Sequence, residues 1–167
     1  LYKETAILCY SKELVKKASS CPNDYIIVLK DAEKEIRSSS YMNVLSLNSA
    51  HPLSVLAHEL GHSFANLADE YTPAPLPKKQ ENCKDNCTQF GNLGCFNGCS
   101  KESYFRSFDN GIMKTLSAKD YGPFDSELIS KRIGNSPNIK ITGNVIQEPV
   151  DCPKQKYYLI EGEYNLG

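Results

Sequence analysis

The chain has 167 residues, a length typical of a single domain. Its formal net charge of −1 provides no basic surface for nucleic acid or for an anionic membrane, so neither is an expected partner. Its longest apolar runs are strand-sized and fall short of the roughly 20 residues that a membrane helix needs, so no membrane span is expected.

The first part of the chain predicts a helix and two strands. Residues 3–19 carry apolar side chains at helical spacing and predict an amphipathic helix. The run DYIIVLK, residues 24–30, is β-branched and bounded by turn formers, so it predicts a buried strand. The stretch SSSYMNVLSL, residues 38–47, alternates loosely and predicts a second strand at the edge of the sheet.

A longer helix is expected from Pro52, because a proline in the first turn lacks only an N–H that would have no partner there. His58 and His62 lie one helical turn apart along it. Apolar residues recur at helical spacing on the opposite face and predict the side that packs on the core: Leu53, Leu56, Leu60, Phe64 and Leu67. The helix is therefore expected to pack with one side and to present both imidazoles from the other.

The sequence HELGHSFANLADEY, residues 58–71, opens with the His-Glu-x-x-His pattern of zinc hydrolases. His58 and His62 can both reach one Zn²⁺ at about 2.0–2.1 Å. Glu59 lies beside the first ligand and can reach a water on the metal, whose pKa the ion lowers toward about 7. Glu59 would take a proton from this water and return one to the leaving amine. The pattern thus indicates peptide hydrolysis without a covalent intermediate.

A third protein ligand is required, with the fourth position left for water. A helix that continued past His62 would carry the next seven residues roughly 10 Å away, so the chain must turn back. Asn66 is the candidate for the turn because asparagine tolerates positive φ, and Asp69 follows three residues later as the predicted third ligand. Glu70 is the alternative ligand. A second alternative is a thermolysin-type site, in which Glu127 from a later helix completes the metal shell.

Cysteine is unusually frequent, with seven residues: Cys9, Cys21, Cys83, Cys87, Cys95, Cys99 and Cys152. The cluster at 83–99 predicts disulfides that pin a long loop in an oxidising compartment. A structural zinc held by two Cys-x₃-Cys pairs is the alternative for a reducing compartment. Disulfides are favoured because the loop is rich in Asn and Gly. Residues 72–101 are predicted to be irregular because three prolines precede the cluster.

The last part of the chain predicts a turn, a helix and a β-rich tail. Gly111-Ile112-Met113 falls in a turn-like stretch. The segment YGPFDSELISKRIG, residues 121–134, predicts a helix that begins at Pro123 and ends at Gly134. Residues 138–167 read as short strands after a break at 135–137.

The block at 58–71 resembles the H-E-x-G-H-S-x-x-x-L-x-D-E-Y block of the IgA-peptidase-type metallopeptidases, the igalysins, within the metzincin-like zinc peptidases. Residues 24–47 and 111–133 are similar to the strands before and the methionine turn and closing helix after that block. The resemblance implies a secreted zinc endopeptidase with Met113 as the turn methionine beneath the metal. The family's first strand would be expected before Leu1 and is missing, so we expect a trimmed piece of a longer protein.

Three other residues are candidates for a place near the site. Tyr121 and Tyr71 could each support the oxyanion or hold a ligand, although a packing role is the simpler interpretation for both in a chain with ten tyrosines. His51 lies too far along the helix to share the metal and is interpreted as a capping or surface residue.

Taken together, the patterns predict an α+β, metzincin-like domain with a small mixed sheet, an active-site helix, an irregular Cys-rich lower half and a C-terminal helix. Residues 1–134 would form the catalytic domain and residues 135–167 a β-rich tail or the start of a further module. The predicted function is a secreted zinc metalloendopeptidase that acts on a protein or peptide substrate. The alternative is a zinc-stabilised, Cys-knit module that recognises protein or glycan through a degenerate protease site. None of these features indicates an oligomeric state.

Overall fold

The computed structural model describes residues 6–10, 12–19 and 23–134. The described residues divide into two compact units, one within residues 6–51 and the other within residues 52–134. The predicted C-terminal tail, residues 135–167, lies outside the described residues. No helix in the described part of the chain combines the length and the apolarity needed to cross a membrane.

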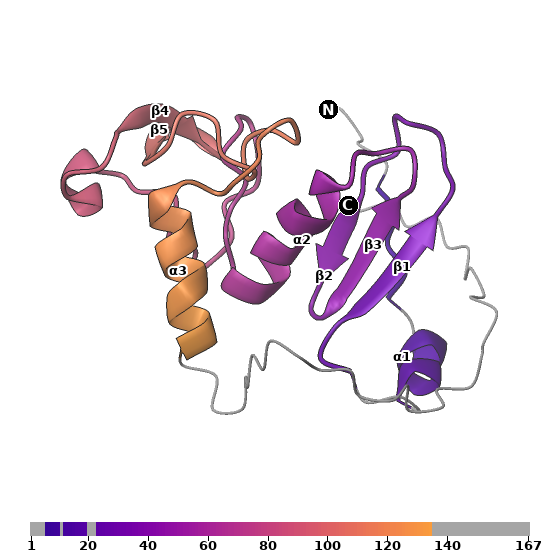
Figure 1. Cartoon of the computed structure of the whole chain (residues 1–167). Coiled ribbons are helices and arrows are strands. Elements are labelled where there is room, and N and C mark those ends of the chain that lie inside the picture. The colour runs from indigo at the N-terminus through magenta and orange to yellow at the C-terminus, as the bar shows by residue number, and fades with distance from the viewer. Residues whose placement is uncertain (1–5, 11, 20–22, 135–167) are drawn as a thin grey trace. The chain divides into compact units, whose positions relative to one another are not determined.

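The first unit contains a small mixed sheet, as predicted, with three strands in place of the two expected (Figure 1). Its strands are β1 (Ile26–Lys30), β2 (Ser39–Tyr41) and β3 (Val44–Asn48), in the order β1-β3-β2. The central strand β3 runs parallel to β1 and antiparallel to β2. Every residue of β3 is buried. Its polar side chains have partners there, since the Ser46 hydroxyl accepts a hydrogen bond from the Cys9 amide at 3.0 Å.

Both strand predictions need correction in detail. The stretch 38–47, predicted as one edge strand, is a hairpin of β2 and β3 that turns at Met42, whose φ is 52°. Only the short arm β2 lies at the edge. The strand β1, predicted to be buried, exposes Ile27 and Leu29 on one face by 47% and 63%. A continuous apolar run therefore did not mean burial on both faces.

The helix predicted over residues 3–19 is shorter in the structure, and α1 spans only Lys12–Ala18. Ala6 instead forms a parallel bridge with Arg37, and the Ile7 amide donates to the Arg37 carbonyl at 2.8 Å. Residues 6–10 are in no helix because their backbone groups find partners in the neighbouring segment. Tertiary pairing thus overrode the helical spacing of the apolar side chains.

The second unit holds the remaining elements: α2 (Ser54–Ala65), the 3₁₀ helix η1 (Cys87–Phe90), β4 (Phe96–Cys99), β5 (Lys101–Arg106) and α3 (Pro123–Gly134). The helix α3 has the predicted bounds. The predicted disulfides are present as Cys83–Cys99 and Cys87–Cys95, and Cys9 is a buried free thiol. The prediction that residues 72–101 are irregular was wrong in part, because they include η1, β4 and the start of β5, paired as an antiparallel hairpin.

The predicted core stripe of α2 was wrong in part, because Phe64 and Leu67 pack on the core but two of its leucines do not. Leu53 is 83% exposed and Leu60 37% exposed, although both belong to the predicted core stripe. The face that carries His58 is also buried, together with Gly61 and Ala65. These two residues are small, so the polypeptide opposite can approach the helix closely on that side.

The core of the second unit lies between α2 and α3. It contains Ala65, Leu67, Met113 and Leu128, with Phe64, Tyr121, Phe124 and Ile129 packed against it. A Cβ at Gly61 would lie 2.6 Å from the Met113 sulfur and 3.1 Å from the Tyr121 ring, so any larger residue would require these side chains to shift. The Tyr121 hydroxyl donates a hydrogen bond to the Ala57 carbonyl of α2. The segment 111–121 is thereby fastened to the histidine-bearing face of α2.

Candidate metal centre

The two histidines of α2 are oriented by backbone carbonyls. The His58 Nδ1 lies 2.8 Å from the Ile112 carbonyl oxygen, and the His62 Nδ1 lies 2.6 Å from the Leu67 carbonyl oxygen. A carbonyl can only accept, so each Nδ1 must carry the proton. In a neutral ring the other nitrogen, Nε2, is then a bare acceptor. Both lone pairs face the same point, because the Nε2 atoms are 3.2 Å apart.

Asp69 reaches the same point because the chain reverses at Asn66, as predicted. Asn66 is the C-cap of α2 and adopts the left-handed conformation, with φ 53° and ψ 36°. Its amide donates to the His62 carbonyl, and the Leu67 amide donates to the Gly61 carbonyl at 3.1 Å. These bonds use helix-end carbonyls that would otherwise lack partners. The segment after the turn then runs back beside the histidines.

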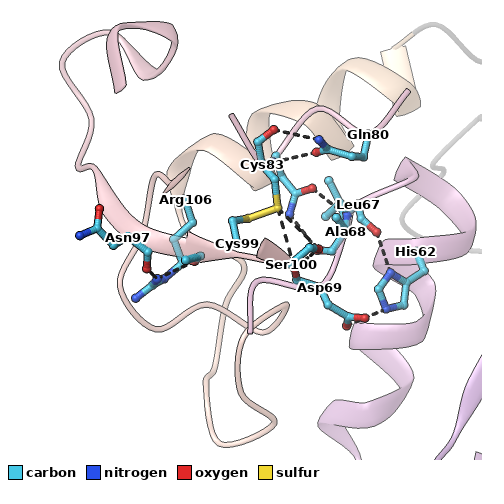
Figure 2. Close-up of a disulfide and its surroundings, with 12 residues drawn as sticks. His62, Leu67, Ala68, Asp69, Gln80, Cys83, Asn97, Cys99, Ser100 and Arg106 are labelled. Atoms are coloured by element: carbon cyan, nitrogen blue, oxygen red, sulfur yellow. Dashed lines mark hydrogen bonds and ion pairs between the residues drawn. A yellow bond between two sulfur atoms is a disulfide. The ribbon is translucent and has the colours of Figure 1, made fainter. Parts of the chain in front are cut away.

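The three predicted ligands form a compact group. The Asp69 Oδ1 lies 3.1 Å from the His58 Nε2 and 3.2 Å from the His62 Nε2, and Figure 2 shows the contact with His62. His58 is buried, whereas His62 and Asp69 are partly exposed, so the group keeps limited access to solvent. His58, His62 and Asp69 are the one set of three or more metal-ligating side chains that meet within the described residues.

The charges of the group depend on one another. Burial raises the pKa of Asp69, but hydrogen bonds from His58 and His62 and their positive charge outweigh burial, so its pKa falls well below the ordinary value. For His62, burial lowers the pKa, whereas the bond to Asp69 and the charges of Asp69 and Glu59 raise it above the ordinary value. The site therefore attracts positive charge, whether as a proton or as a metal ion.

The donor atoms suit a divalent metal. When the rings are neutral, two bare imidazole nitrogens and a carboxylate oxygen face one another at 3.1–3.2 Å, which is unfavourable without a cation among them. Tetrahedral zinc with ligands at about 2.0–2.1 Å separates neighbouring ligand atoms by about 3.3 Å. Zinc takes nitrogen and carboxylate ligands, and a set of three protein groups leaves a fourth position open.

Glu59, which lies between the two histidines in the sequence, and Met113, which lies well beyond Asp69, both belong to the surroundings of this group. Glu59 is 6% exposed on α2, and its charge acts on His62. Met113 is fully buried against Gly61 within a turn, in which the Lys114 amide donates to the Gly111 carbonyl at 2.9 Å. The residue before Met113 supplies the carbonyl that orients His58. The turn thus supports the histidine as well as the core.

The other residues considered as metal ligands do not belong to the group of His58, His62 and Asp69. Glu70 is 1% exposed and is not part of the histidine group. Glu127 is exposed and pairs with Lys131 at 2.8 Å along α3. The imidazole of His51 lies 3.1 Å from the Ser38 hydroxyl and 3.0 Å from the Lys34 carbonyl.

Tyr121 and Tyr71, the two tyrosines considered as supports of the oxyanion, lie in different surroundings. The Tyr121 hydroxyl is engaged by α2, which fits its packing interpretation. Tyr71 is half-buried directly after Glu70.

Glu70 and Asp125 form a second buried acidic pair. Burial and the charge of Asp125 raise the pKa of Glu70 to about 9, and burial raises the pKa of Asp125 to about 7. Between the ordinary values near 4 and these raised values, the folded protein holds more protons than the unfolded chain. The free energy of unfolding must therefore decrease as pH rises through this window.

The direction of this pH dependence of stability can be tested on metal-free protein. We expect its melting temperature to fall from pH 5 to pH 9, and Asp125→Asn to make the fall smaller because one buried charge is gone. Thermal unfolding followed by circular dichroism measures both, with Asp85→Asn, an exposed acidic residue, as the control. If the melting temperatures of the three proteins changed with pH in parallel, a raised pKa of Asp125 would be contradicted.

Comparison with known protein families gives independent evidence about the function of this site. The family model described as IgA Peptidase M64 matches residues 4–88, which is half of the chain and includes the whole block 58–71. The chain belongs to this family. It is therefore a peptidase of a metallopeptidase family, as the block at 58–71 indicated. Among curated proteins, none matches the chain significantly in sequence. The M64 match ends before Met113, so the turn and α3 are placed by the structure.

Sequence reasoning missed the groups that hold the ligands in place. The carbonyls of Ile112 and Leu67 orient the rings, but backbone atoms leave no pattern in a sequence. Asn82 and Ser100, which bond the backbone around Asp69, were also missed. Their only signal was that each is next to a cysteine of the cluster.

Proposed function

We propose that this M64 chain is a zinc-dependent endopeptidase in which His58, His62 and Asp69 hold the metal. One observation carries the proposal: three acceptor atoms converge within 3.1–3.2 Å of one another at a partly buried point, with both imidazoles fixed as Nδ1 donors. A bound Zn²⁺ would polarise the scissile carbonyl and lower the pKa of a coordinated water toward about 7.

Glu59 is the proposed general base. It lies next to His58 on α2, is almost completely buried, and is close enough to His62 to shift its pKa. A carboxylate in this place can accept a proton from the attacking water and then donate it to the amine of the departing peptide. The Nδ1 hydrogen bonds of His58 and His62 keep the rings from rotating, so Nε2 stays directed at the metal position.

Metal removal tests the function directly. The chain should cleave a fluorescently quenched, unfolded protein, lose this activity after dialysis against a chelator, and regain it with one equivalent of Zn²⁺. The metal content of each sample is measured by mass spectrometry. Full activity in metal-free protein would refute the proposal. Zinc binding without cleavage of any unfolded protein would favour the alternative recognition module instead.

We also propose that the protein is secreted. Disulfides persist in oxidising compartments, and the second unit contains two within residues 83–99. Mass spectrometry of the protein from its native source, alkylated before and after reduction, should show these four cysteines oxidised. Four free thiols would place the protein in a reducing compartment.

A further inference from the structure

The segment that carries Asp69 has no secondary structure of its own. Residues 67–69 lie in no helix or strand, so their amide and carbonyl groups need partners from elsewhere. The direction of a side chain is set by the two peptide planes on either side of its Cα. Groups that form hydrogen bonds with these two planes therefore help to orient the Asp69 carboxylate.

Asn82 holds the peptide plane before Asp69. Its side chain is fully buried and forms two hydrogen bonds with one residue, Ala68. The Asn82 Oδ1 accepts from the Ala68 amide at 2.7 Å, and its Nδ2 donates to the Ala68 carbonyl at 3.0 Å. The Ala68 carbonyl belongs to the peptide plane before Asp69 and the Ala68 amide to the plane before Ala68, so the Nδ2 bond restrains the first plane and the Oδ1 bond restrains its neighbour.

Ser100 and Met113 hold the plane after Asp69. The Ser100 hydroxyl donates to the Asp69 carbonyl at 2.7 Å, and the Glu70 amide donates to the Met113 carbonyl at 2.8 Å. Ser100 is 1% exposed and has a φ of 58°, a conformation that most residues with a side chain avoid. With both planes bonded, the backbone angles of Asp69 are fixed.

The disulfide Cys83–Cys99 joins the two holding side chains. Asn82 directly precedes one half-cystine and Ser100 directly follows the other. Figure 2 shows the bond beside the ligand segment, with Cys83 Sγ 3.8 Å from the Asp69 carbonyl oxygen. The second disulfide, Cys87–Cys95, closes a separate loop with a sequence separation of 8 that contains η1.

We propose that Asn82, Ser100 and the disulfide Cys83–Cys99 form one positioning unit that aims Asp69 at the metal, so that breaking it weakens metal binding. The proposal rests on the proposed function, since it assumes a metal held by Asp69. It assigns the Cys-rich loop a role in the affinity of the site in addition to the stability of the fold. Outer partners of metal ligands commonly change metal affinity by about 10–100-fold.

The test compares matched variants of the whole chain. Asn82→Ala, Ser100→Gly and the double variant Cys83→Ala/Cys99→Ala remove the unit. Asn86→Ala and Cys87→Ala/Cys95→Ala are the controls, because Asn86 is an exposed asparagine before the other disulfide and also bonds a backbone amide. Glycine is chosen at position 100 because it removes the hydroxyl and adopts positive φ freely.

Three readouts are needed: the Zn²⁺ dissociation constant by competition with a chromophoric chelator, the visible absorption of the Co²⁺-loaded protein, and melting by circular dichroism. We expect about tenfold or greater weakening and an altered Co²⁺ spectrum in each folded variant of the unit, and neither change in the controls. A purely structural role would lower the melting temperature and leave the dissociation constant and the spectrum of the folded protein as in the wild type.

The outcomes separate this proposal from the function it rests on. Unchanged Zn²⁺ affinity in Ser100→Gly and Asn82→Ala, or equal weakening by loss of either disulfide, overturns the positioning unit while the metal site stands. Absence of Zn²⁺ binding in the wild type overturns both. Should a variant of the unit fail to fold, Ser100→Gly decides, because it deletes one hydroxyl and relieves rather than adds backbone strain.

Discussion

Replacing Glu59 by glutamine is expected to lower peptide hydrolysis by about 10²–10⁴-fold, the usual contribution of a general base. Glutamine has nearly the same shape, so the buried position on α2 stays filled. It cannot take a proton from water at neutral pH, and the reaction loses its base. The three metal ligands are untouched, so the Zn²⁺ dissociation constant should stay within a few-fold of the wild-type value.

The measurement is kcat/KM on a quenched peptide, together with the zinc content of each protein. Glu127→Gln is the matched control, because Glu127 is exposed on α3 and pairs only with Lys131 among the ion pairs of the described residues. It should retain full activity, which would also remove Glu127 as an alternative ligand. A Glu59→Gln protein with wild-type kcat/KM would show that another group acts as the base.

The parts of the site that sequence predicted are those governed by short-range geometry. Helical spacing places His58 and His62 together, and the tolerance of asparagine for positive φ places the turn at Asn66. The structure has both features, and the turn brings Asp69 to the histidines. These relations lie within twelve residues of sequence, so no knowledge of the tertiary fold was required.

The errors at the site concern contacts made over long distances in the chain. The apolar stripe of α2 was assigned to the core, but Leu53 and Leu60 are exposed because Met113 and Tyr121 pack on the face with Gly61 instead. The spacing of a helix shows that two faces differ and does not show which of them the rest of the chain covers. The partners of Asp69 were hidden for the same reason, since Ser100 lies 31 residues away.

Asp69→Ala is expected to weaken Zn²⁺ binding by more than about 100-fold, since even outer partners of metal ligands cost 10–100-fold. Its Oδ1 is the only atom in the site that brings a negative charge into contact with both Nε2 atoms. Without it, His58 and His62 provide two ligands, and zinc in proteins needs at least three. Activity should fall in proportion to the metal lost at a given Zn²⁺ concentration.

Glu70→Gln is the comparison that decides between the two neighbouring acids. Glu70 is buried beside Asp125 and lies outside the histidine group, so its amide variant should keep the Zn²⁺ affinity of the wild type. Competition with a chromophoric chelator measures both proteins under the same conditions. If Glu70→Gln lost the metal and Asp69→Ala kept it, the ligand assignment would be reversed. The turn at Asn66 would then have to deliver Glu70 to the histidines and direct Asp69 away from them.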